Sequence, residues 1–319
     1  MRSNLRSRRR QFKRALIDRL IALKERLPEQ FYTEPPATFG YALLVPSVLL
    51  IGTLFVGMVL LAYYSVLTHD PIEYLLYEPT IENWIEIART TAFHEVFVRT
   101  FLLAAVVTVV SVALALPYAY LSIRIRSPIV RKLLLVSIFV PFFTGVIVRA
   151  YGWLIIFGRD GLLNSLLGVL GIGPVRFLAS EVAVVIGLVQ IMFPYAIIMI
   201  APAIQSIDRS LELAASNLGA NRIQTFRHVV IPLAMPGIAG ATIVVFTITA
   251  ATFAIPDIIG GGQVDFVANL IYRTLFDSSH LPRAAALSVL LVAITSVVVL
   301  AIFRTVGAGT FGVERGDNR

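Results

Sequence analysis

Long apolar segments alternate with shorter polar segments along almost the whole chain, which is the pattern of a protein that crosses a membrane several times. A helix needs roughly 20 apolar residues to span about 30 Å of hydrocarbon. We therefore expect an all-α integral membrane protein with six transmembrane helices. The six apolar segments are residues 41–66, 101–123, 133–157, 182–207, 233–256 and 284–303.

Lysine and arginine are distributed unevenly between the polar segments. Twenty of the 27 basic residues lie in polar segments that share one side of the membrane if the six spans alternate in direction. By the positive-inside rule this side is the cytoplasm. Both termini and the polar segment 205–232 are therefore predicted to be cytoplasmic.

Composition supports a membrane protein and argues against a nucleic-acid-binding one. The chain has 57% hydrophobic and 14% charged residues, whereas about a quarter of the residues in a soluble protein are charged. The formal net charge of +8 comes from residues beside apolar spans, so we expect no nucleic-acid partner. The chain contains no cysteine, which excludes disulfides and thiolate metal sites.

The first 36 residues are predicted to form a separate cytoplasmic segment. Phe12, Leu16, Leu20, Leu23 and Leu27 recur at helical spacing among basic residues, which favours an amphipathic helix along the inner leaflet. A nucleic-acid-binding arm is the alternative, but it does not suit a segment directly before a spanning helix. The predicted organisation is residues 1–36, a transmembrane domain at 37–307 and a cytoplasmic tail at 308–319.

No sequence pattern indicates catalysis by this chain. The phosphate-binding pattern G-x-x-x-x-G-K-[ST] is absent, and the glycine run 260–262 continues with Gln263 and Val264. None of the four histidines has a second histidine three or four residues away, so we expect no metal site. We predict a non-enzymatic protein that binds no cofactor itself.

The cytoplasmic segment before the fifth span has the pattern of a short helix. Asp208 is placed to cap it, because its carboxylate can accept a hydrogen bond from an N–H of the first turn. Leu211, Ala215 and Leu218 then share one face, and Gly219 provides the left-handed residue that ends the helix. A plain polar connection between two spans is the alternative.

A second helical stretch is predicted after this turn. Ile223, Phe226 and Val230 repeat at helical spacing, and Pro232 marks a bend where the chain enters the fifth span.

This segment resembles the "EAA" loop of permease subunits of binding-protein-dependent ABC importers. The family pattern is E-A-A, three residues, G, nine residues and I-x-L-P. Ala214, Ala215 and Gly219 match it, and conservative residues stand at Val229 and Ile231 before Pro232. The wider resemblance, from about residue 41 to 304, is closest to spermidine/putrescine permeases of the PotB type. It is carried by residues 138–153, 161–172, 191–208 and 232–240.

The resemblance implies a type I ABC importer permease in the bacterial inner membrane. Such a subunit is expected to form a heterodimer with a second permease subunit. It works with two ATPase subunits and a periplasmic substrate-binding protein. ATP and Mg would be bound by the ATPases, and alternating access would move a small organic solute, most simply a polyamine, into the cytoplasm. The implied ATPase-coupling residues are Leu211, Glu212, Leu213, Ala214, Ala215, Leu218, Gly219, Phe226 and Pro232.

One position departs from the family pattern. Leu213 stands where the family has Glu, and Glu212 is displaced by one residue, which rotates its carboxylate by about 100° around a helix. Docking is therefore expected to depend on the shape of Ala214, Ala215 and Gly219, with Glu212 at most a substitute charge.

Polar and aromatic residues near the spans suggest a path for an organic cation. Asp257 together with Tyr151, Trp153, Phe193 and Tyr195 would make an acidic and aromatic lining, and cation–π attraction contributes about 0.5 to 2 kcal/mol per contact. A capping Asp and an interfacial aromatic belt are the alternative interpretation.

The fifth span contains small residues that permit close helix packing. Gly237, Gly240 and Ala241 favour an interface with the partner permease, and packing within the subunit is the equal alternative.

Other functions remain as alternatives. A permease for opines or aminobutyrate-like solutes would share the same architecture. A secondary carrier is less favoured, because the spans hold no Asp or Glu away from their ends. A scaffold that only gathers partners predicts no substrate-dependent change in ATP hydrolysis.

Overall fold

The structure is a computed structural model and describes residues 37–70 and 75–304. The predicted amphipathic segment 1–36 and tail 308–319 lie outside the described residues. The chain divides after Met58 into two compact units, which are described separately.

Helix α2 (Ala37–Ser65) contains the whole described part of the first unit and the start of the second. Its apolar stretch from Leu44 to Ser65 is 22 residues long, which is sufficient to cross a bilayer. A helix that is apolar on all sides is suited to a lipid environment.

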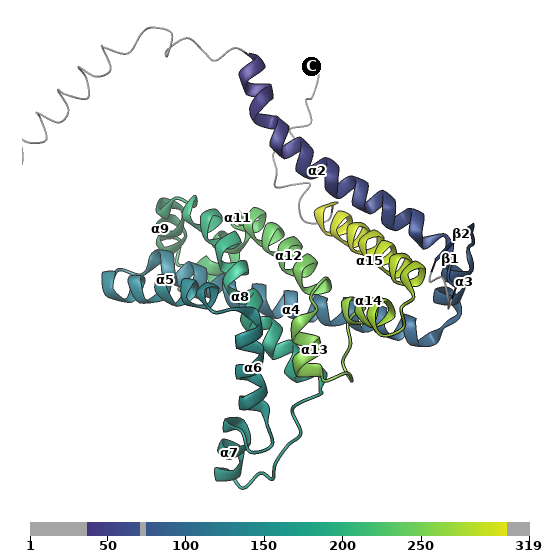
Figure 1. Cartoon of the computed structure of the whole chain (residues 1–319). Coiled ribbons are helices and arrows are strands. Elements are labelled where there is room, and N and C mark those ends of the chain that lie inside the picture. The colour runs from purple at the N-terminus through teal and green to yellow at the C-terminus, as the bar shows by residue number, and fades with distance from the viewer. Residues whose placement is uncertain (1–36, 71–74, 305–319) are drawn as a thin grey trace, which may run out of the picture. The chain divides into compact units, whose positions relative to one another are not determined.

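The second unit is almost entirely helical, with one short antiparallel pair of strands (Figure 1). Its elements are β1 (Leu67–Thr68), β2 (Leu76–Pro79), α3 (Glu82–Arg89), α4 (Thr91–Arg124), α5 (Pro128–Phe143), α6 (Val146–Phe157), α7 (Leu162–Val169), α8 (Glu181–Gln205), α9 (Arg209–Asn217), α10 (Arg222–Thr225), the π-helical turn η2 (Phe226–Val230), α11 (Ile231–Leu233), α12 (Met235–Ala250), α13 (Ala254–Gly260), α14 (Val267–Phe276) and α15 (Leu281–Ile302).

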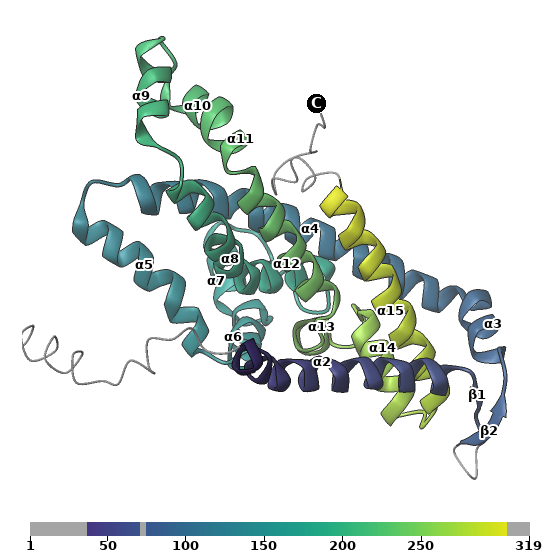
Figure 2. The same ribbon diagram turned by 90° about the horizontal axis from the view of Figure 1, so that it is seen from above.

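Helices α4, α8 and α12 pack against one another and form the centre of this unit (Figure 2). Val107 of α4 and Ala241 of α12 are fully buried, and Ile197 of α8 is almost so. A Cβ added to Gly237 would lie 2.6 Å from the Cβ of Ala203 on α8, so Gly237 packs within the subunit. Gly240 has no such neighbour within 4 Å and remains available to a partner.

The six predicted spans correspond to four straight helices and two bent pairs. Helices α2, α4, α8 and α15 are long and apolar enough to cross a membrane unaided. The break between α5 and α6 bends the third span by 100°, and the break between α11 and α12 bends the chain by 71° where the fifth span begins. The span expected at 133–157 is therefore interrupted by a break, and the span expected at 233–256 begins at a bend; each bent pair still permits one crossing.

Proline lies at both breaks, and glycine lies at the first. Pro141 and Gly145 flank the first, and Pro232 and Pro236 flank the second. Proline lacks the N–H that a continuous helix needs, which explains why neither span continues straight. The bend predicted at Pro232 is confirmed within two residues.

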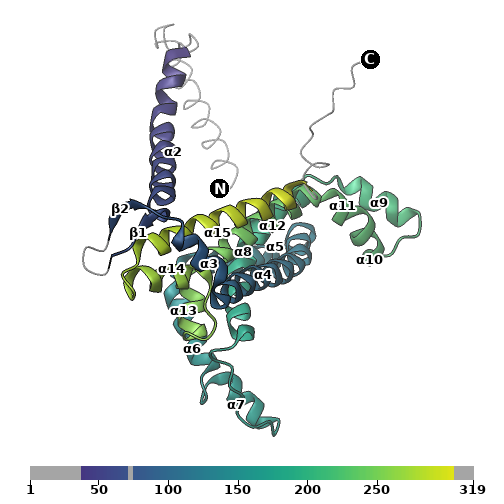
Figure 3. The same ribbon diagram turned by 90° about the vertical axis from the view of Figure 1, so that its right-hand side faces the viewer.

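Helix α8 connects two loops that lie at opposite ends of the unit. Its 25 residues correspond to about 37 Å at 1.5 Å per residue, enough to cross the hydrocarbon layer. The loop after α7 enters its first turn, and α9 and α10 follow its last turn (Figure 3). The two loops therefore belong to opposite sides of the membrane.

Candidate functional site

The first helix of the segment 205–232 forms as its sequence predicts. The Asp208 Oδ1 atom accepts a hydrogen bond from the Ser210 N–H at 2.8 Å, which caps α9. This bond holds the pKa of the Asp208 carboxyl below its ordinary value. At the other end Gly219 adopts φ of +90°, the left-handed conformation that favours glycine.

The second stretch differs from the single helical face that was predicted. Asn221 caps α10, but the backbone then widens into η2, where the Ile231 N–H donates to the Phe226 carbonyl. Ile223 is 77% exposed, whereas Phe226 is partly buried and Val230 is fully buried. The three residues therefore do not share one environment.

Large apolar side chains on this segment are exposed. Leu213 is 64% exposed and Leu218 is 90% exposed. Ala215, Leu218 and Gly219 line a groove of about 490 Å³ between α9 and the α10–η2 stretch, which confirms that Ala215 and Leu218 share a face. Leu211 does not line this groove. Apolar side chains gathered on a polar loop indicate a surface that another protein covers.

Glu212 does not belong to this exposed surface. Its Oε1 atom lies 2.6 Å from Arg124 Nη2, and both side chains are about 15% exposed or less. Its Oε2 atom accepts a hydrogen bond from the Tyr120 hydroxyl at 2.7 Å. We call Tyr120, Arg124 and Glu212 the α4 anchor, because they tie α9 to the end of α4.

Two further contacts hold the α4 anchor in place. Arg124 Nη2 donates to the Ile207 carbonyl at 2.8 Å, and the ring of Tyr120 lies edge-on to that of Phe226, with centroids 5.2 Å apart. In this conformation the Glu212 carboxylate is engaged within the subunit, and its role as at most a substitute charge in docking stays a prediction. The rotation caused by its displacement turns it toward α4 and leaves Leu213 exposed.

Sequence reasoning missed Tyr120 and Arg124. They stand four residues apart in the last turns of α4, so they share a helix face. A tyrosine and an arginine on one face are a signal for an acidic partner. The partner itself is 88 residues from Arg124 in the sequence, and only the side-chain contacts of the folded chain identify it.

A second candidate site lies among the spans. Helices α4, α5, α6 and α8 line a cavity of about 800 Å³ whose walls are mostly apolar. Tyr118, Trp153 and Phe193 supply aromatic rings to its lining, and the rings of Tyr118 and Phe193 meet edge to face at 5.3 Å. Gln190 also lines it, and its buried Oε1 atom has no hydrogen-bond partner in the described part of the chain.

The structure brings together only two of the predicted path residues. Trp153 and Phe193 line the cavity. Tyr195 packs instead against Phe142, with ring centroids 5.1 Å apart, and Tyr151 is 56% exposed outside the lining.

Asp257 also lies outside this cavity. It is on α13, where its Oδ1 atom is 3.5 Å from Asn269 Nδ2, and α13 follows the C-terminal end of α12. The five residues therefore do not form one lining in this conformation. Tyr118 and Gln190 were missed by a search for acidic and aromatic residues near the span ends. Gln190 carried a signal that could have found it, because it is a polar residue within an apolar span.

Residues 112–308 match the model of the family described as the binding-protein-dependent transport system inner membrane component. The match covers more than half of the chain and includes both candidate sites. The chain belongs to this family. It is therefore an ABC transporter permease subunit, and the permease is an inner membrane component.

Characterised relatives extend the similarity over most of the permease. It is 32% identical to the spermidine/putrescine transport system permease protein PotB of Haemophilus influenzae, over 75% of this chain and 84% of that protein. It is 30% identical to PotB of Escherichia coli, over 82% of this chain and 90% of that protein.

The fold agrees with this assignment. A solved bacterial alginate ABC transporter, in complex with a periplasmic protein bound to an alginate pentasaccharide, superposes with a TM-score of 0.72 at 18% identity. The alignment covers 84% of the permease and 93% of the matched chain. The expected type I permease fold is confirmed.

Proposed function

We propose that this permease is one transmembrane half of an ATP-driven importer that moves a polyamine-class cation from the periplasm to the cytoplasm. The observation that carries the proposal is the apolar surface of α9 and α10, exposed at Leu213, Leu218 and Ile223, on the loop of a permease without a phosphate-binding sequence. An ATPase that covers this surface would supply the energy from outside the chain.

In this proposal each of the two ATPase subunits binds ATP and Mg, and one of them contacts α9 and its groove. Closure of the two ATPases displaces α9, and the α4 anchor passes this displacement to α4. A second permease subunit forms the other half of the path. The spans then alternate between inward-facing and outward-facing states.

We infer the orientation of the permease in the membrane from the distribution of charge. Basic residues beside the spans favour a cytoplasmic location for the loop 205–232 and for both termini. The end of α8 that holds the loop before Glu181 is then periplasmic, where the substrate-binding protein delivers the solute.

The cavity supports a cationic substrate. Its aromatic rings present negatively polarised faces, and the unpaired Gln190 carbonyl oxygen is an acceptor for an ammonium group. Asp257 was predicted to share one lining with these rings; because it lies outside the cavity, we propose it instead as a separate, outer contact for the cation. The names of the similar proteins, spermidine/putrescine permeases, support the same class.

The substrate class is tested by uptake into proteoliposomes that contain the complete transporter, with its binding protein outside and ATP inside. We expect accumulation of radiolabelled spermidine or putrescine, and no competition from an opine or from γ-aminobutyrate. Uptake of either competitor in place of polyamines would contradict the polyamine assignment while leaving the ATP-driven mechanism intact.

The substitution Gln190→Leu tests the cavity. It should leave assembly intact, because it removes a buried carbonyl that has no partner. Spermidine uptake at limiting substrate should fall roughly tenfold, which corresponds to the loss of about 1.4 kcal/mol of binding. The matched control is Tyr195→Phe, which removes a polar atom from the same helix outside the cavity. Equal losses in both variants would contradict a role for the cavity.

The substitution Asp257→Asn tests the outer contact. It keeps the side-chain size but removes the negative charge, so it should weaken uptake of a cation at limiting substrate and spare assembly. Measurement of uptake across substrate concentrations would show a raised KM. An unchanged uptake curve would contradict a contact between Asp257 and the cation, and would leave Asp257 only its contact with Asn269.

A further inference from the structure

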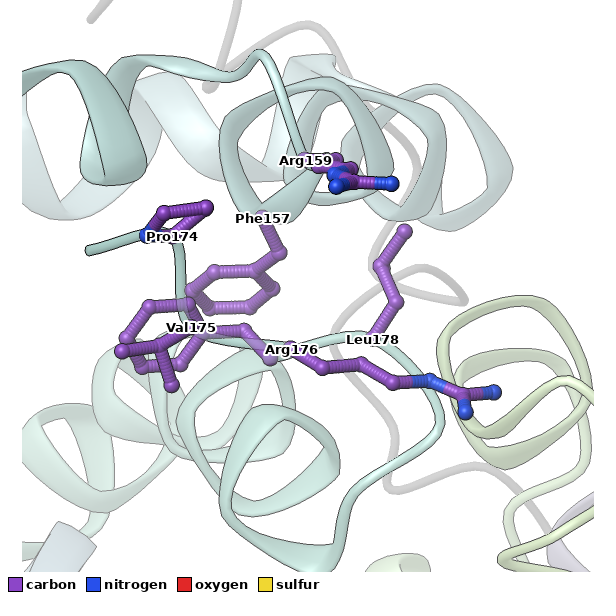
Figure 4. A pocket seen from close by; sticks show the side chains of 7 residues that line it. Phe157, Arg159, Pro174, Val175, Arg176 and Leu178 are labelled. Carbon is purple, nitrogen blue, oxygen red and sulfur yellow. The ribbon is translucent and has the colours of Figure 1, made fainter.

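A second pocket lies at the end of α8 opposite the coupling loop. The end of α6 and the loop before α8 enclose about 550 Å³, lined by Phe157, Arg159, Pro174, Val175, Arg176, Phe177 and Leu178 (Figure 4). No residue of the proposed substrate cavity lines it.

Hydrogen bonds and a tight turn fix the segments that line the pocket. Asn164 is buried, and its side chain forms three hydrogen bonds that tie α7 to the segments lining the pocket: Nδ2 donates to the Gly158 and Val175 carbonyls, and Oδ1 accepts from the Val175 N–H. A Cβ at Gly161 would lie 2.4 Å from the Ile155 carbonyl oxygen, so only glycine fits this turn.

Aromatic stacking supports the floor of the pocket. Phe157 is 2% exposed, and its ring stacks on Trp153 at 4.9 Å and on Phe177 at 6.1 Å between centroids. The two segments that carry the lining are therefore held together before any ligand arrives, which reduces the entropic cost of binding.

The charges of this pocket are unbalanced. Arg159 and Arg176 come from the two lining segments, and Figure 4 shows their guanidinium groups to the right of the Phe157 ring, above and below the Leu178 side chain. Both are exposed, and neither forms an ion pair with an acid in the described part of the chain.

Three other arginines at the same end of the spans have acidic partners. Arg99 lies 3.3 Å from Glu181, and Arg273 lies 2.7 Å from Asp265. Arg283 pairs with Glu86. The two arginines of the pocket differ from these three in lacking a carboxylate, as does Arg89 in the described part of the chain.

We infer that this pocket docks an acidic side chain of the periplasmic binding protein, flanked by apolar contacts. Guanidinium groups bind carboxylates through paired, charge-assisted hydrogen bonds, and the aromatic floor fits the apolar part of the same residue. The volume suits one or two side chains, which is the scale of an anchoring contact in a larger interface. The inference rests on the proposed function, because the periplasmic location follows from the orientation proposed there.

The first test measures the affinity of the complete transporter, in nanodiscs, for the binding protein that stimulates its ATP hydrolysis. The double variant Arg159→Gln and Arg176→Gln should raise the Kd about tenfold to hundredfold and weaken its dependence on salt. The control, Arg126→Gln with Arg131→Gln, removes the same charge at the cytoplasmic end and should keep the wild-type Kd. A wild-type Kd in the pocket variant would overturn the inference.

The second test does not depend on the stability of the double variant. Because the chain has no cysteine, Arg176→Cys creates a single site for a photoreactive maleimide. We expect a covalent adduct with the binding protein, and none from Arg126→Cys. An adduct with phospholipid alone would overturn the inference in favour of an anionic headgroup.

The two failures can be told apart. If the binding protein stimulates wild-type ATP hydrolysis but neither its Kd nor its cross-linking involves the pocket, only the docking inference fails. If the binding protein has no effect on the wild-type complex, the proposed function fails as well.

Discussion

Gly219→Asp is expected to release the ATPase from the permease while the chain still inserts in the membrane. A Cβ at this position would meet no atom within 4 Å in the permease itself, so the new side chain clashes with nothing in the subunit. The φ of +90° adds strain of about 1 to 2 kcal/mol. Any larger effect must come from a charge placed beside Leu218 in the surface that the ATPase covers.

Co-purification of the ATPase with the permease measures this effect. We expect less than about a tenth of the wild-type ATPase to remain bound, which corresponds to about 1.4 kcal/mol or more of lost affinity. Gly219→Asn separates strain from charge, because asparagine has the shape of aspartate and tolerates the left-handed conformation similarly, but carries no charge. Gly171→Asp is the matched control at the other end of α8: its φ is +75°, and its added Cβ also meets no atom. Equal loss of ATPase from both Asp variants would contradict the docking surface.

Exchange of the charges in the α4 anchor should first abolish and then restore transport. Glu212→Arg places two cations together and leaves the Tyr120 hydroxyl without its acceptor, so the firm connection between α9 and α4 is lost. Breaking a buried ion pair by changing one partner costs about 3 to 5 kcal/mol. We expect ATP hydrolysis to continue with little substrate uptake, because ATPase closure no longer moves α4.

The double variant Glu212→Arg with Arg124→Glu should recover a substantial part of the uptake per ATP, since the opposite charges meet again. Arg126→Glu is the control, because Arg126 is exposed two residues beyond α4 and forms no ion pair in the described part of the chain. Absence of recovery in the double variant, together with normal assembly, would show that the anchor does not transmit motion.

The number of spans and the bend near Pro232 could be predicted from the sequence, but the break in the third span could not. Hydropathy depends on residues that are contiguous in the chain, so it detects each crossing. The break at Gly145 depends instead on which neighbours satisfy the backbone beside a proline. The same limit applies to Asp257, which follows a span in sequence but lies on the separate helix α13.

The coupling loop shows the same difference between local and distant information. The cap at Asp208 and the turn at Gly219 follow from local backbone chemistry, and the structure confirms both. The role of Glu212 depends on Tyr120 and Arg124, which are distant in sequence. Its displacement by one residue was visible in the sequence, but only the packing of α9 on α4 explains where the carboxylate points.

The central claim is that this permease transports its substrate only when an ATPase drives it through α9. The most direct measurement is spermidine accumulation in proteoliposomes prepared with the complete complex, with the complex lacking the ATPase, and with the permease alone under an ion gradient. The account predicts accumulation only in the first preparation, and only with ATP and the binding protein present. Accumulation by the permease alone would contradict it and would identify a secondary carrier.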